Sequence, residues 1–204
     1  MDNKIEIRPI LQEDSWPKGS ACVCAVMLLQ YMGLQISVDE FIDNFLPQHK
    51  IRYREGFLTG PDPDVQFVGS PYDAKSFGCY PGVIVRAMNE CFRQKGLTWR
   101  AEDATGLSTR ELLAASLDRG MPPIYWVTGD MKPPVLELSW QIRGTDRRAS
   151  WYRNCSCMLM TGCDSDTMTF LDPAGEAGPL KVSRMLAVKR HAELGKRSVI
   201  VRKE

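Results

Sequence analysis

The sequence predicts an α+β fold in which helices come first and an antiparallel sheet follows. Three observations indicate this class. Apolar helical patterns dominate the first 120 residues, segments rich in β-branched and aromatic residues cluster after residue 122, and the two kinds do not alternate as βαβ units would. With 204 residues, 44% of them hydrophobic, the chain is long enough for one substantial core. We therefore expect one domain spanning residues 1–204.

The N-terminal part leads into the most apolar helix of the chain. Residues 5–11 alternate between apolar and polar side chains and predict a strand, which Pro9 restricts to the edge of a sheet. The segment 17–33 is a Pro/Gly turn followed by an apolar run that is too continuous for a surface stripe. We expect a buried helix here that begins at Ser20 and ends before Gly33.

Capping residues mark most of the later helices. The later helices are expected at about 37–45, 81–96, 108–119 and 183–192. Ser37 with Glu40, and Ser108 with Glu111, have the spacing of a capping box. The second of these helices has proline in its first turn and glycine at its end, and Ser183 should cap the last.

Residues 46–80 show no sustained period and are rich in proline and glycine, so we expect a long loop that covers the domain. Strands are expected where β-branched and aromatic residues gather, at 123–128, 135–140, 155–161, 167–171 and 198–202.

A series of short motifs follows the same order as the landmarks of a known family. They are Gln12, Pro17-x-Gly19, the apolar run to Tyr31-Met32-Gly33, Gly78-Cys-Tyr-Pro-Gly82, Pro122 to Met131, Trp151, Thr161-Gly-Cys-Asp164 and Leu171-Asp-Pro173. This order resembles the bacteriocin-processing cysteine peptidase family 39, and more closely its stand-alone 39-like branch. The resemblance spans nearly the whole chain and implies a bacterial protein with a papain-like cysteine peptidase fold.

The resemblance also assigns the family's site to positions in this sequence. Gln12 matches the glutamine of the oxyanion hole, and Asp172 matches the third member of the triad. The catalytic cysteine falls on Ser20, the glutamate after it on Ala21, and the catalytic histidine on Ser156. A serine hydroxyl is a poor nucleophile without a base, and a second serine is not a base at neutral pH. The altered site therefore predicts an inactive peptidase.

Strand alternation predicts how these groups face one another. Ser156 lies on one face of its strand, and Cys155 and Cys157 lie on the other. We expect Ser156 to face Ser20 across a cleft while the two thiols point away. Asp172, at the end of the next strand, should lie beside Ser156.

The main functional prediction is a pseudopeptidase that keeps a cleft for a peptide or protein ligand, lined by Gln12, Ser20, Ser156 and Asp172. One alternative is an active hydrolase that uses another thiol. Cys24 is its first candidate, because it follows Ser20 by one helical turn on the same face, and Cys22 is the second.

A second alternative is a metal- or redox-responsive module built from the pairs Cys22-x-Cys24 and Cys155-x-Cys157. This spacing is shorter than the usual separation of zinc ligands, so no metal and no cofactor are predicted. The seven cysteines are an odd number, which suits free thiols in a reducing compartment.

Net charge and composition limit the classes of partner that we expect. A net charge of +1 gives no electrostatic reason to expect nucleic acid or a membrane surface. The first residues lack the apolar region of a signal peptide, so we expect a cytoplasmic protein. His49 and His191 are the only histidines, and both are expected on the solvated surface. The sequence gives no prediction of the oligomeric state.

Overall fold

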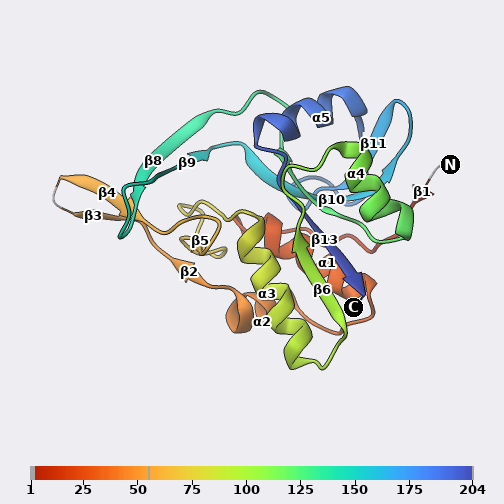
Figure 1. Ribbon diagram of the computed structural model, residues 1–204, viewed down its shortest axis with the longest axis horizontal. Coiled ribbons are helices and arrows are strands. Elements are labelled where there is room, and N and C mark those ends of the chain that lie inside the picture. The colour runs from red at the N-terminus through yellow and green to blue at the C-terminus, as the bar shows by residue number, and fades with distance from the viewer. Residues whose placement is uncertain (1–2, 55, 204) are drawn as a thin grey trace.

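The computed structural model describes residues 3–54 and 56–203 and is built around one antiparallel sheet (Figure 1). The strands run in the order β12-β11-β10-β7-β13-β6, and β1 also pairs with β10. Their bounds are β1 (Asn3–Lys4), β6 (Trp99–Asp103), β7 (Ile124–Thr128), β10 (Cys155–Cys163), β11 (Thr167–Leu171), β12 (Pro179–Ser183) and β13 (Ser198–Lys203). Every pairing in this sheet is antiparallel, which confirms the predicted fold class.

Helices cover both faces of the main sheet (Figure 1). They are α1 (Ser20–Tyr31), α2 (Val38–Phe45), α3 (Pro81–Gln94), α4 (Thr109–Ala115), followed by the 3₁₀ turn η1 (Leu117–Arg119), and α5 (Arg184–Glu193). The first three share a core with the sheet face that carries Trp126 and Leu159. Residues of α4, η1 and α5 share a second core with the opposite face, which carries Tyr125 and Met158. None of the helices in the described residues is long and apolar enough to span a bilayer.

Helix α1 is buried as the sequence predicts. All nine residues from Ala21 to Leu29 lie in the core. Gly19 precedes the helix because a Cβ there would lie 2.7 Å from the Cβ of Trp16. Gly33 ends it with a φ of 93°, a backbone conformation that favours glycine.

The capping predictions hold for two helices and fail for one. The Ser37 side chain accepts a hydrogen bond from the Glu40 N–H, and Ser108 with Glu111 forms a reciprocal capping box. Ser183, in contrast, makes no side-chain cap. It is the last residue of β12, paired with Thr167, so α5 starts directly from a strand.

The expected edge strand at 5–11 is not formed. In this N-terminal segment only β1 forms a strand, which pairs with β10, and residues 5–12 are irregular. The apolar residues of this segment, Ile7 and Ile10, instead pack against the core that contains α1. Their alternation therefore reflects burial of an irregular segment and not a strand.

Residues 46–80 form short strands where we expected a loop. These are β2 (Gln48–His49), β3 (Arg52–Arg54), β4 (Phe57–Gly60) and β5 (Phe67–Val68), and they contribute to two smaller sheets. One sheet pairs β3 and β4 with β8 (Leu136–Ile142) and β9 (Arg148–Tyr152), and it projects from the rest of the fold (Figure 1). Strands of two to four residues are too short to show a period. The sequence also missed β1, β6, β9 and β12.

His191 is buried, contrary to the expectation of a surface position. Its ring stacks on Tyr125 with centroids 3.7 Å apart, and its Nδ1 lies 2.8 Å from the carbonyl oxygen of Trp126. Burial lowers the pKa of His191 to about 4, and the positive charge of Lys196 acts in the same direction, while the bond to Trp126 opposes them. The imidazole is therefore neutral at neutral pH and serves the second core.

Acidification should destabilise the fold through His191. The unfolded imidazole binds its proton near pH 6.5 and the folded one only near pH 4. The unfolded state therefore binds more protons between these values, and stability falls as the pH falls. We expect a loss of about 2 kcal/mol between pH 7.5 and pH 5, measured by urea unfolding. His191→Gln should flatten this dependence and His49→Gln should not. An unchanged slope in His191→Gln would contradict the assignment.

Candidate functional site

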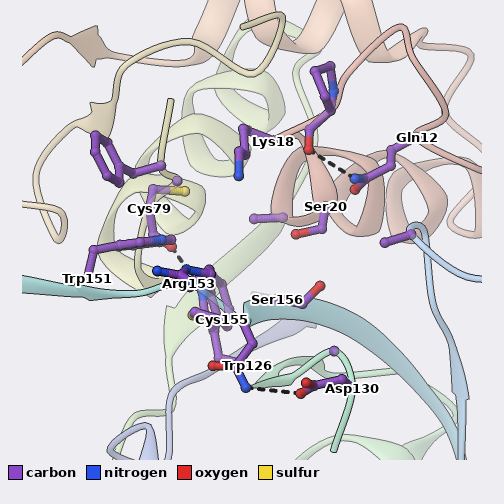
Figure 2. A pocket seen from close by; sticks show the side chains of 17 residues that line it. Gln12, Lys18, Ser20, Cys79, Trp126, Asp130, Trp151, Arg153, Cys155 and Ser156 are labelled. Carbon is purple, nitrogen blue, oxygen red and sulfur yellow. Dashed lines mark hydrogen bonds between the residues drawn. The ribbon is translucent and has the colours of Figure 1, made fainter. Parts of the chain in front are cut away.

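A cavity of about 280 Å³ lies between the N-terminus of α1 and the start of β10 (Figure 2). Gln12, Ser20 and Ser156, three of the four predicted site residues, line it. Segments far apart in the chain meet here, namely the approach to α1, the start of α1 and the turn from β9 into β10. We refer to this cavity as the central pocket.

Helix α1 is fastened to β10 by two hydrogen bonds at the main chain of Cys157. The Cys157 N–H donates to Ser20 Oγ at 3.2 Å, and Cys24 Sγ donates to the Cys157 carbonyl oxygen at 3.4 Å. Ser20 and Cys24 are one helical turn apart on the same side of α1. The Ser20 oxygen is therefore an acceptor for the sheet.

The Cys157 main chain is available to α1 because of how β10 pairs. In β7, Trp126 lies opposite Cys157, but its N–H donates to the Arg197 carbonyl and its carbonyl contacts His191. The N–H and C=O of Cys157 thus point to the other edge of β10. On that edge, β11 ends at Leu171, opposite Leu159, and leaves Cys157 unpaired.

The prediction that the cysteines on either side of Ser156 point away from the site is wrong for Cys155, whereas Cys157 does not line the central pocket. Cys155 and Ser156 both line the central pocket, while Cys157 and Leu159 pack in the core that contains α1. Alternation correctly separates Cys155, Cys157 and Leu159, which pack in this core, from Met158 and Met160, which pack in the second core. The error arises because α1 packs beneath the face that carries the cysteines and only its N-terminus reaches the edge near Ser156.

Asp172 lies outside the central pocket. It lines a neighbouring hollow of about 510 Å³ together with Glu176, and the two cavities share Gly129. Continuing the pairing of β10 and β11 by one residue brings Asp172 opposite Met158, on the face that Ser156 shares. Burial raises the pKa of Asp172. The hydrogen bond that its carboxylate accepts from the Ala174 N–H lowers the pKa, but by less.

Gln12 is oriented by its own loop. Its Nε2 donates to the Pro17 carbonyl at 3.2 Å. Its Oε1 is buried and finds no hydrogen-bond partner among residues 3–54 and 56–203. One of the two N–H donors of the amide nitrogen is thus engaged, and the other is left for a further acceptor.

The alternative nucleophiles do not reach the pocket. Cys22 and Cys24 are fully buried in α1. Burial also raises the pKa of Cys22, with a further contribution from neighbouring Cys24, so this thiol stays protonated. Cys155 does line the pocket, but burial raises its pKa to about 12. No group of three or more metal-ligating side chains is present in the described part of the chain.

No histidine lines the central pocket among the residues described. His191 belongs to the second core, and His49 lines a separate hollow near Arg143. The site therefore offers no imidazole to take a proton from Ser20.

Sequence reasoning did not assign to the site four large side chains that line the pocket. These are Lys18, Trp126, Trp151 and Arg153. In Figure 2, Lys18 and Arg153 extend into the same space from opposite walls. Trp151 is one of the landmark residues, and Lys18 lies two residues before Ser20. Neither sequence pattern indicates that the loop before α1 and the turn between β9 and β10 lie close together.

Comparison with known proteins identifies the family of this chain. The chain matches the Peptidase_C39 like family over residues 4–196. It belongs to this family. The C39-like chain is also similar to a crystal structure described as a "putative C39-like peptidase" from Bacillus anthracis, with a TM-score of 0.82, 20% identity and 98% of each chain covered. At this identity the likeness shows the fold alone. The search of curated proteins found no match. The predicted family resemblance is confirmed.

Removing the Ser20 hydroxyl should weaken the attachment of α1 in the C39-like chain. Ser20→Ala deprives the Cys157 N–H of its acceptor, so we expect a loss of about 1 kcal/mol in urea unfolding. Ser156→Ala is the matched control, because no hydrogen bond of the Ser156 hydroxyl is found in the described part of the chain. It should change stability by less than about 0.5 kcal/mol. Equal effects of the two variants would contradict the proposed role of Ser20.

Thiol labelling should follow burial. Cys163 and Cys155 are partly exposed, whereas Cys22, Cys24 and Cys157 are at most 1% exposed. We expect iodoacetamide at pH 7.5 to modify Cys163 first and the buried three at least about tenfold more slowly, as measured by peptide mass mapping. In urea all should react. Early modification of Cys22 or Cys24 in the folded protein would favour the hydrolase alternative.

Proposed function

We propose that this C39-like chain is a non-catalytic member of its family that binds a peptide segment of a ligand in the central pocket. The supporting observation is the position of Ser20. It stands at the start of α1, where the family resemblance predicts the nucleophile, yet its oxygen accepts the Cys157 N–H, and the described residues that line the pocket include no histidine.

A comparison of two rate effects favours inactivity over weak catalysis. The partial positive charge at a helix N-terminus contributes at most about 2 kcal/mol, which corresponds to about 30-fold in rate. Loss of the nucleophile and base of a triad costs about a millionfold. The start of α1 cannot compensate for the missing thiol and imidazole.

The pocket itself is retained although the catalytic groups are absent. It is open to solvent, is walled by Trp126 and Trp151, and carries charged groups that a peptide could contact. Function depends on such a site and not on the fold alone. A hydrolase based on Cys22 or Cys24 gains no support, because both thiols are buried away from the pocket.

The test is incubation of the purified protein with a diverse mixture of peptides, followed by mass spectrometry of retained and newly formed species. We expect retained peptides and no cleavage products. The double variant Ser20→Cys with Ser156→His should cleave peptides that the unmodified chain only retains, because it supplies a thiol and an imidazole.

Cleavage products from the unmodified chain would refute the proposal. So would the retention of no peptide at all. Ser20→Cys alone is the matched control, since a thiol without a base should gain far less activity than the double variant.

A further inference from the structure

Two cationic side chains meet in the central pocket without any acidic partner. Lys18 belongs to the loop before α1 and Arg153 to the turn between β9 and β10. Both point into the cavity in Figure 2. Among residues 3–54 and 56–203, neither side chain forms an ion pair or a hydrogen bond with another residue.

Among the described residues, one acidic side chain lines the pocket, and it is already engaged. Asp130 accepts hydrogen bonds from Asn154 Nδ2 at 3.0 Å and from the Lys132 N–H at 3.1 Å. Desolvation raises the pKa of Asp130, but these hydrogen bonds outweigh it and leave the pKa below its usual value. Asp130 thus stays ionised and bound to its own turn. The positive charge at Lys18 and Arg153 remains available to a ligand.

Aromatic rings form firm walls around this charge. Trp126 is held by a hydrogen bond from its Nε1 to the Cys79 carbonyl at 2.9 Å. Trp151 stacks on Tyr80 with centroids 5.2 Å apart. Gly78 makes room for the Trp151 ring, because a Cβ there would lie 2.6 Å from its Cη2 atom. A rigid apolar wall of this kind suits the uncharged part of a peptide.

The volume limits what can enter. The cavity volume of about 280 Å³ lies just below the range for small-ligand pockets, which is about 300–1,000 Å³. The space suits a short peptide segment and excludes a folded element. An arginine fork binds a planar carboxylate through two parallel hydrogen bonds, and a lysine adds a point charge from the other side.

We propose that the central pocket selects peptides through a carboxylate group, which Lys18 and Arg153 bind from opposite walls. This inference rests on the proposed peptide-binding function and names the class of ligand. The carboxylate comes either from a peptide C-terminus or from an aspartate or glutamate side chain, since both present the same planar anion.

The test measures retention of matched peptides by the full-length protein. Each peptide is prepared in four forms. Its C-terminus is either free or amidated, and its internal positions carry either glutamate or glutamine. We expect the form with neither carboxylate to bind at least about tenfold more weakly than the others. Comparison of the two singly charged forms distinguishes the terminal from the side-chain carboxylate.

Variants assign the effect to the two cations. Lys18→Gln and Arg153→Gln should each weaken binding of the carboxylate peptides about tenfold and leave binding of the neutral form unchanged. Arg153→Glu should reverse the preference toward peptides that carry lysine. Arg148→Gln is the matched control, because it removes a positive charge from β9 at a residue that does not line the pocket.

The outcomes separate the two proposals. Equal binding of charged and neutral peptides, with no effect of the Lys18 and Arg153 variants, would overturn the carboxylate preference and leave peptide binding intact. Failure of the unmodified protein to retain any peptide, charged or neutral, would overturn the proposed function itself.

Discussion

The attachment of α1 to the unpaired edge of β10 determines where the central pocket lies. Ser20 and Cys24 together engage both main-chain polar groups of Cys157. Because main-chain groups without partners are costly, this contact fixes the helix in height and in rotation against the sheet. The loop before the helix and the first residues of β10 then take their positions from it. Lys18, Cys155 and Ser156 meet around one cavity for this reason.

The contact between Ser20 and Cys157 supports the fold without any need for catalysis. A hydroxyl at the start of α1 can receive the Cys157 N–H whether or not a base is present, so the packing does not require a triad. In this chain the surroundings of Ser20 are consistent with that structural use, since no histidine and no reactive thiolate adjoin it in the described residues. The family fold persists at 20% identity to its solved relative because burial and backbone pairing sustain it.

Sequence reasoning succeeded where the signal was local. Helix α1 is apolar on all sides, the Ser108 capping box is complete within four residues, and β10 is rich in residues that favour strands. It failed where the result depends on tertiary contacts. Alternation tells which side chains of β10 share a face, but only packing decides which face meets α1. Burial of His191 depends on Tyr125, far away in the sequence, and the meeting of Lys18 and Arg153 depends on two loops.

Gly129 lines both the central pocket and the hollow beside Asp172, and it carries no side chain. A Cβ at this position would lie 3.3 Å from the Cβ of Ser156, which is already tight for a methyl group. A side chain at this position would therefore enter the space where two cavities of unlike charge adjoin, one lined by Lys18 and Arg153 and the other by Asp172 and Glu176.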